Sequence, residues 1–338
     1  MIRRPPRSTQ GVSSAASDVY KRQMYVHLAH LTKTLKFGCG FNVNPMWHPL
    51  RLAEDYATAD ILTKGRIIFG VARGYHTREV DTFGVPSTLT DSDANREIFE
   101  EQVEIIMKAF NEESFSHKGK HYKLPPAVPY RGYTLKELTL VPRPLTIPVE
   151  TYQPLVSASQ PAMDFMAKHG IKGIIGGGAA TGGAADGLVK QWQETLAKYG
   201  RETELGGDLI IGIATFIDDT EEKAIGRAKR YFEENMKMFA PLGFVRGLSD
   251  EQLTALGRGS EAYSAGLPTM EDAVRAGAWM VGPPERVSER LMELQDRYPG
   301  LEEMNVGASV MSTEQSVVLD QLDLFGKEVM PTFKNQRK

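Results

Sequence analysis

The chain combines short, wholly apolar runs with longer segments in which apolar residues recur at helical spacing. Residues 66–71 and 209–213 are mainly apolar and rich in β-branched side chains, without the alternation of a half-buried strand. Such runs are typical of strands buried on both faces of a sheet. Phe99, Val103 and neighbouring apolar residues recur every three or four positions, which predicts a helix over residues 91–110. Strands that alternate with helices predict an α/β fold with a parallel sheet.

The same pattern predicts the order of elements along the rest of the chain. The predicted strands cover residues 35–40, 66–71, 147–152, 171–175, 209–217 and 304–310. The predicted helices cover residues 25–31, 49–64, 91–110, 159–169, 188–199, 220–238, 283–298 and 314–329. The stretches predicted to be loops or irregular excursions are residues 113–145, 176–187 and 240–280.

Residues 48–75 are the most informative stretch, because a complete helix–strand step ends there in a cation. Pro49 suits the first turn of a helix, where its missing N–H needs no partner, and Gly65 suits the end of that helix. The strand that follows runs out at Arg73 and Gly74. A cation and a glycine just beyond the carboxyl end of a buried parallel strand lie where α/β barrels keep their active sites.

Several separated segments together resemble the bacterial luciferase-like superfamily of flavin-dependent monooxygenases. They are HPLRLAE (48–54), GR (65–66), GVARGY (70–75), NREIFEE (95–101), FSH (115–117), GKHY (119–122), VGPPE (281–285) and FGKEVMP (325–331). Each motif is weak alone, but their order and spacing are specific, and the resemblance covers most of residues 24–338. It implies an α/β fold of the luciferase-like type, a (β/α)8 TIM barrel, with FMN as the cofactor and O2 as a co-substrate.

The resemblance implies that Arg73 binds the phosphate group of the flavin. Such a site needs a bidentate donor and open backbone N–H groups, which Arg73, Gly74 and Tyr75 would supply. An ordinary surface arginine in a loop is the alternative. Ser157 and Ser159 resemble a second phosphate-binding element, at the start of a helix whose N–H groups attract anions. Simple helix capping by serine is the alternative there.

Gly40, Phe41 and Asn42 lie at the end of the strand that is third in the family pattern. Some family members have a cis peptide bond and a bulge at this point, against the flavin ring. The resemblance therefore makes these residues candidate flavin contacts, with an ordinary strand end as the alternative. The catalytic residues stay unknown, because the family's acid–histidine loop has no match among the seven histidines. No metal site is expected, since no histidine pair has the three or four ligands that zinc requires.

Residues 1–23 show no apolar periodicity and are rich in arginine and serine. That composition resembles a transit peptide, but the ending SSAASDVYKRQ more specifically resembles translated sequencing-adapter DNA. We therefore expect residues 1–23 to be a non-native, disordered tail and residues 24–338 to be the barrel domain. Because residues 35–40 correspond to the third barrel strand of the family, we also expect an N-terminally truncated barrel. The first two βα units, roughly 60 residues, would then be missing.

Composition argues against several other classes of function. The 40 basic and 43 acidic residues nearly balance, so neither a nucleic acid nor a membrane is expected as a partner. No apolar run approaches the roughly 20 residues of a membrane helix. The single cysteine, Cys39, allows no intrachain disulfide, which fits a reducing, cytoplasmic location. The glycines at 176–178 do not form a dinucleotide fingerprint, because Thr181 stands where its last glycine should be.

The sequence thus indicates an FMN-dependent monooxygenase that uses reduced flavin and O2 to oxidise a small organic substrate. The resemblance implies a separate NAD(P)H-dependent flavin reductase as a partner and is compatible with a homodimer. A deazaflavin-dependent oxidoreductase of the same fold is the runner-up, and an inactive flavin-binding fragment is a further alternative. No motif identifies the substrate.

Overall fold

The computed structural model describes residues 24–74, 80–127, 129–176, 183, 185–239, 248–256, 266–307 and 313–334. The tail expected at residues 1–23 and Tyr75 of the expected phosphate loop lie outside the described residues. The chain divides into two compact units. Unit 1 contains the residues up to Gln153 together with Lys168–Ile171, and unit 2 contains Pro154–Ala167 and the residues from Lys172 onward.

Unit 1 is built on short parallel strands around β3 (Ile67–Ala72). The strands that pair with β3 are β1 (Phe37–Gly38), β2 (Asn42–Val43) and β8 (Thr151–Pro154). The strand predicted at residues 66–71 is confirmed, and most of its residues are buried, as its apolar composition requires. β8 begins at Thr151 instead of at residue 147, because Pro148 has no N–H to donate to a neighbouring strand.

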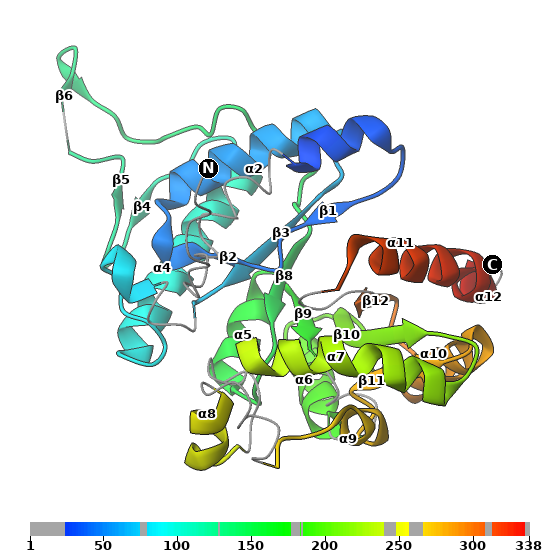
Figure 1. Ribbon diagram of the computed structural model, residues 1–338. Coiled ribbons are helices and arrows are strands. Elements are labelled where there is room, and N and C mark those ends of the chain that lie inside the picture. Colours follow the sequence, from blue (N-terminus) through cyan, green and yellow to red (C-terminus); the bar gives the residue numbers. More distant parts are fainter. Residues whose placement is uncertain are drawn as a thin grey trace, which may run out of the picture. The chain divides into compact units, whose positions relative to one another are not determined.

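Two helices, α2 (Pro49–Thr63) and α4 (Ser92–Asn111), pack on one another beside β3 (Figure 1). The Phe69 ring of β3 meets the Tyr56 ring of α2 at a centroid distance of 4.4 Å and the Phe110 ring of α4 at 5.6 Å, edge to face in both pairs. All three rings are buried. The apolar stripe predicted for α4 therefore packs into the core of unit 1.

The ends of these two helices follow the local sequence. Asp91 caps α4 by accepting a hydrogen bond from Ala94 N at 3.0 Å. α2 ends at Lys64 and Gly65, which take left-handed φ values of 61° and 76°. The glycine adopts this conformation without a steric penalty, which is why it ends the helix as predicted.

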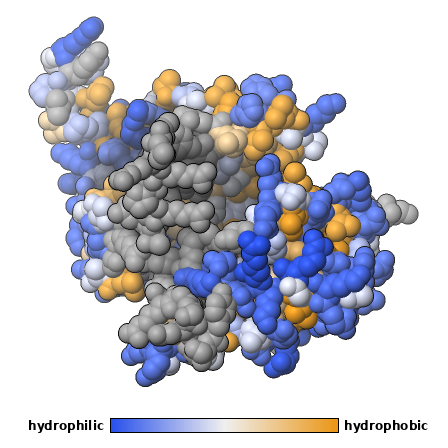
Figure 2. Space-filling view, viewed as in Figure 1, coloured by the Kyte–Doolittle hydropathy of each residue, from blue (hydrophilic) through white to orange (hydrophobic). Residues whose placement is uncertain are grey.

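The excursion predicted at residues 113–145 contains two antiparallel hairpins and follows α4. The strands of the hairpins are β4 (His117–Lys118) with β5 (Lys123–Leu124), and β6 (Pro129–Tyr130) with β7 (Tyr133–Thr134). Figure 1 shows the β6–β7 hairpin extending away from the helices of unit 1. Hydrophobic residues gather at the top of the face drawn in Figure 2, where α2 lies. Ile61 and Leu62, near the end of α2, are exposed apolar side chains.

A largely buried carboxylate fastens the first hairpin to α4. Glu101 accepts hydrogen bonds from the backbone N atoms of His121 and Tyr122, at 2.9 and 2.8 Å, and its Oε1 lies 3.0 Å from His117 Nε2. Burial raises the pKa of the Glu101 carboxyl, but the hydrogen bonds outweigh it and hold the pKa below its ordinary value. The histidine at 117 therefore serves the packing of the hairpin.

Unit 2 is built around β10 (Leu209–Ile217), whose bounds match the predicted strand. Its parallel partners are β9 (Lys172–Ile175), β11 (Trp279–Gly282) and β12 (Glu303–Gly307). The described helices are α5 (Gln160–Lys168), α6 (Asp186–Lys198), α7 (Glu221–Phe239), α8 (Asp250–Leu256), α9 (Met270–Arg275), α10 (Pro284–Arg297), α11 (Gln315–Leu324) and α12 (Met330–Lys334). A π-helical turn, Phe325–Val329, interrupts the closing helix predicted over residues 314–329. None of the helices that the structure describes is long and apolar enough to cross a membrane.

The irregular stretch predicted at residues 240–280 is wrong at α8 and again at its end, where α9 and β11 form. β11 has only four residues, all buried, and so short an apolar run carries no periodicity to identify it. α9 begins with a capping box, in which Thr269 and Asp272 each bind the other's backbone N–H. The apolar core of unit 2 includes the rings of Trp279 in β11 and Phe232 in α7, whose centroids are 6.1 Å apart.

Gln321 of α11 is buried and completes the backbone hydrogen bonding of β10. Its Oε1 accepts from Ile217 N at 2.6 Å, and its Nε2 donates to Ile217 O at 2.8 Å. Replacing Gln321 with leucine leaves both backbone groups unpaired in the core, so the free energy of unfolding should fall by about 2–4 kcal/mol, measured by urea titration. Gln315→Leu, at an exposed position of the same helix, should change it by less than about 0.5 kcal/mol. Equal stability of the two variants would contradict this role of Gln321.

Candidate active site

The carboxyl ends of β2 and β3 place the expected site residue Arg73 next to a second polar residue, Asn44. Val43 pairs in parallel with Ala72, so Asn44 and Arg73 are the first residues beyond two adjacent strand ends. Neighbouring strands lie about 4.8 Å apart. The two polar residues therefore occupy one small region, at the edge of a parallel sheet where ligands bind in α/β proteins.

Gly74 forms a tight corner directly after Arg73. Its φ is 82°, a left-handed conformation that favours glycine. A Cβ atom at this position would lie 2.5 Å from Val43 Cγ1 and 2.4 Å from Val80 Cγ2, so no larger side chain fits. Phosphate binding by the backbone N–H groups of Gly74 and Tyr75 stays a prediction.

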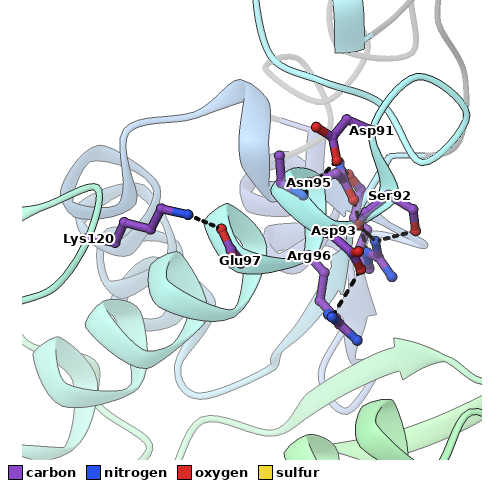
Figure 3. Close-up of polar contacts among 9 residues, drawn as sticks. Asp91, Ser92, Asp93, Asn95, Arg96, Glu97 and Lys120 are labelled. Atoms are coloured by element: carbon purple, nitrogen blue, oxygen red, sulfur yellow. Dashed lines mark hydrogen bonds and ion pairs between the residues drawn. The ribbon is translucent and has the colours of Figure 1, made fainter.

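The Arg73 guanidinium is held along one edge by the first turn of α4, whose residues are drawn in Figure 3. Its Nε donates to Asn95 Oδ1 at 2.9 Å. Its Nη2 donates to the backbone O of Ser92 and, at 3.2 Å, to Ser92 Oγ. Among the described residues, no hydrogen bond involves Nη1. The Nη1 amino group is therefore the part of the guanidinium that these contacts leave for a ligand.

The Arg73 guanidinium lies near a second guanidinium, that of Arg96, and near the carboxylates of Asp93 and Glu100. Burial lowers the pKa of the Arg73 guanidinium, and the nearby charge of Arg96 lowers it further, against the opposite effect of Glu100 and Asp93. Arginine nevertheless stays protonated at neutral pH. Arg96 Nη2 lies 3.0 Å from Asp93 Oδ1 (Figure 3). Burial raises the pKa of Glu100, while Arg96 and Arg73 oppose that shift.

Asn95 and Arg96 are site residues that the sequence reasoning did not single out. Their role depends on the first turn of α4 lying beside the end of β3, which is a tertiary contact. One signal was present, because Asn95 stands four residues before Phe99 and so lies in line with the apolar stripe of α4. It is fully buried, and a polar residue inside an apolar stripe calls for a specific partner.

The Gly40–Phe41 peptide bond is cis. Asn42, the next residue, is fully buried and donates from Nδ2 to Tyr56 OH and to Gly70 O, both at 2.6 Å. Its Oδ1 has no hydrogen-bond partner among the described residues. These contacts join β2 to α2 and β3, and binding of the flavin ring by Gly40, Phe41 and Asn42 stays a prediction.

Asn44 is the most unusual polar residue of this region. Only 1% of it is exposed, yet neither its Oδ1 nor its Nδ2 has a hydrogen-bond partner in the part of the chain that the structure describes. Most buried amides in proteins are paired, and an unpaired one indicates that a water molecule or a ligand completes the bonding. Asn44 is thus a buried polar group that no described residue pairs, beyond the strand end that adjoins Arg73.

Ser157 and Ser159 lie in unit 2, before α5. Ser157 is exposed and Ser159 is partly buried. The backbone O of Ser159 accepts from Met163 N at 3.1 Å, which puts this serine at the start of the helix. Gln160, the first helical residue, donates from Nε2 to Thr195 Oγ1 at 3.0 Å within the same unit. Phosphate binding by the two hydroxyl groups stays a prediction.

Comparison with known proteins establishes the family. A sequence model described as luciferase-like monooxygenase matches residues 21–299. The chain belongs to the luciferase-like monooxygenase family. Among the curated relatives of this luciferase-like chain is the FMNH(2)-dependent dimethylsulfone monooxygenase of Pseudomonas fluorescens. It is 23% identical over 295 residues, which cover 84% of this chain and 70% of that protein.

Solved structures of similar shape show the fold. The oxygenating constituent of 3,6-diketocamphane monooxygenase from Pseudomonas putida, solved with FMN, has a TM-score of 0.67 at 18% identity, covering 92% of this chain and 83% of that chain. An F420-dependent secondary alcohol dehydrogenase, solved with an F420–acetone adduct, has a TM-score of 0.65 at 16% identity and the same coverages of 92% and 83%. The luciferase-like chain therefore has the TIM-barrel type of fold predicted from its sequence, and the predicted truncation of that barrel stays a prediction.

Proposed function

We propose that the chain is an FMN-dependent monooxygenase, which uses reduced FMN and O2 to oxidise a small organic substrate. The observation that carries the proposal is Arg73, partly buried at the end of β3 and held along one edge by the first turn of α4, a helix that also carries Arg96. Two neighbouring guanidinium groups attract an anion. A phosphate monoester, with about −1.5 to −2 charges at pH 7, matches them.

The donors of this region fit the phosphate end of FMN. Guanidinium groups bind phosphate through two parallel N–H···O bonds, and Gly74, packed between Val43 and Val80, fixes the corner of the chain that follows Arg73. The unpaired amide of Asn44 can both donate and accept, which suits the hydroxyl groups next to the phosphate. Asp93 forms an ion pair with Arg96, and this carboxylate limits the positive charge of the site.

When bound, reduced FMN supplies the electrons for the reaction with O2, and the protein binds and orients the flavin. The proposal includes Ser157 and Ser159 as further phosphate-binding residues, Tyr75 as a backbone donor, and Gly40, Phe41 and Asn42 as contacts of the ring. It assigns no catalytic acid or base.

A second candidate function is that of a deazaflavin-dependent oxidoreductase. The similarity in fold to an F420-dependent alcohol dehydrogenase favours it, because the same barrel there holds a deazaflavin. The two functions differ in their second substrate. A monooxygenase consumes O2, whereas a deazaflavin enzyme transfers hydride to or from an organic substrate without O2.

The proposal also names partners. A separate NAD(P)H-dependent reductase would supply reduced FMN, as expected for a protein whose fold matches the oxygenating constituent of a monooxygenase. A homodimer is the proposed state of assembly. Exposed apolar side chains of unit 1, among them Leu31, Leu35, Ile61, Leu62 and Leu145, are of the kind that a second subunit covers.

The test of the function mixes the full chain, in excess, with anaerobically reduced FMN and then with O2. Flavin absorbance and O2 consumption are followed together. We expect the bound flavin to reoxidise at a rate clearly different from that of free FMN, because the site replaces bulk water around it. A time course identical to free FMN would contradict the proposal. Binding without a changed reaction with O2 would favour the inactive-fragment alternative, and anaerobic oxidation of a reduced deazaflavin by a carbonyl compound would favour the second candidate.

A further inference from the structure

We propose that Asn95 is a positioning residue, which fixes the Arg73 guanidinium for the phosphate group and so sets the preference of the site for FMN over riboflavin. This inference rests on the proposed function of Arg73 as the phosphate-binding residue. It assigns to Asn95 no contact with the flavin itself. Asn95 acts through the arginine that it holds.

The geometry shows one side chain holding both ends of one arginine. Asn95 Oδ1 accepts from Arg73 Nε at 2.9 Å, and Asn95 Nδ2 donates to the backbone O of Arg73 at 2.7 Å. The same Nδ2 donates to Pro86 O at 2.9 Å. Both amide hydrogens and the amide oxygen are therefore used. Asn95 is fully buried, so water does not compete for these bonds.

This arrangement fixes the guanidinium before any ligand arrives. An arginine side chain has many rotamers and loses that freedom when it binds a ligand. Asn95 and the backbone O of Ser92 hold the Nε–Nη2 edge of Arg73, while the described residues offer no partner to Nη1. Because the guanidinium is planar, fixing one edge also fixes the direction of the other. Preorganisation of this kind increases affinity for the ligand that the fixed group binds.

A purely structural role of Asn95 would have a different signature. Through Pro86, Asn95 also ties the segment before α4 to the helix, and losing that contact would lower stability. Lower stability of the protein weakens the binding of every flavin to a similar degree. A positioning role acts only through the phosphate group, so it changes the ratio of the riboflavin Kd to the FMN Kd.

The experiment titrates the full chain anaerobically with reduced FMN and with reduced riboflavin, which lacks only the phosphate group. We expect Asn95→Ala to lower the Kd ratio roughly 10-fold, the lower end of what losing an orienting partner costs at metal sites. In the Arg73→Ala background, Asn95→Ala should leave the ratio unchanged, because the group that it positions is gone. Asn95→Asp preserves the side-chain volume should the alanine variant not fold. It should also lower the ratio, because it adds a negative charge beside the phosphate and loses the Nδ2 donor.

Gln102 provides a matched control on the same helix. It is buried to a similar degree, and its Nε2 donates to Trp47 O at 3.0 Å and to Tyr122 OH at 2.7 Å. Gln102→Ala should lower stability but keep the wild-type Kd ratio. The inference is overturned if folded Asn95 variants keep the wild-type ratio, or if Asn95→Ala lowers it equally in the Arg73→Ala background. A wild-type chain without preference for FMN would instead contradict the proposed function, and the inference with it.

Discussion

Replacing Arg73 with alanine is expected to weaken the binding of reduced FMN by about 2–3 kcal/mol, or roughly 30- to 150-fold. The variant removes the charged donor that the first turn of α4 holds in place, and the phosphate group loses its charge-assisted hydrogen bonds. Riboflavin has no phosphate group, so its affinity should change little. Anaerobic titration of wild type and variant with both flavins measures the difference.

Arg51→Ala is the control for a general loss of positive charge. Arg51 is exposed on α2 and lies 2.8 Å from Glu54, so its removal changes the net charge of unit 1 by the same amount. It should leave the FMN affinity unchanged. Equal losses of FMN affinity in the two variants would mean that FMN binding depends only on the overall charge. Arg73 would then not belong to the site.

Replacing Gly70 with alanine is expected to lower the free energy of unfolding by at least about 3 kcal/mol, the upper range for overpacking. β3 lies so close to the segment after β1 that a Cβ atom on Gly70 would be 1.8 Å from the backbone O of Cys39 and 3.2 Å from Phe41 Cδ1. A backbone carbonyl cannot relieve this clash by rotating away, as a flexible side chain can. The strand that carries Arg73 must therefore shift, and FMN affinity should fall together with stability. Urea unfolding measures the first effect and anaerobic titration the second.

Gly226→Ala is the matched control for adding a methyl group to a glycine. Gly226 lies inside α7, and an added Cβ would meet no other atom within 4 Å. Alanine in a helix interior is favoured over glycine by roughly 1 kcal/mol, so this variant should be at least as stable as wild type. If Gly70→Ala were equally stable, the close approach of β3 to Cys39 would be contradicted.

The elements that could be predicted from the sequence are long and have a clear pattern of apolar residues. β10 is nine residues long and almost wholly apolar, and α4 carries an apolar stripe over five turns, so both could be located without a structure. β11 could not, because its four residues form a strand only through pairing with the end of β10. The start of β8 was misplaced for a similar reason, since the preceding segment is apolar but contains a proline.

The residues of the candidate site also differ in whether local sequence or tertiary packing reveals them. Arg73 and Gly74 follow directly from their position after a buried strand. Asn95 and Arg96 belong to another element, and only the packing of α4 beside β3 brings them to the arginine. Asn42 was expected at the flavin ring from its place in the chain. The direction of its amide, toward Tyr56 and the backbone of β3, depends on strand register, which the sequence does not reveal.

We expect the end of β3 to bind the phosphate group of FMN through Arg73. A crystal structure of the full chain with bound FMN tests it most directly. Phosphate oxygens should lie at hydrogen-bond distance from the Arg73 guanidinium, roughly 2.7–2.9 Å, with Asn95 still bound to Nε. A phosphate group bound elsewhere, with Arg73 contacting only α4, would contradict it.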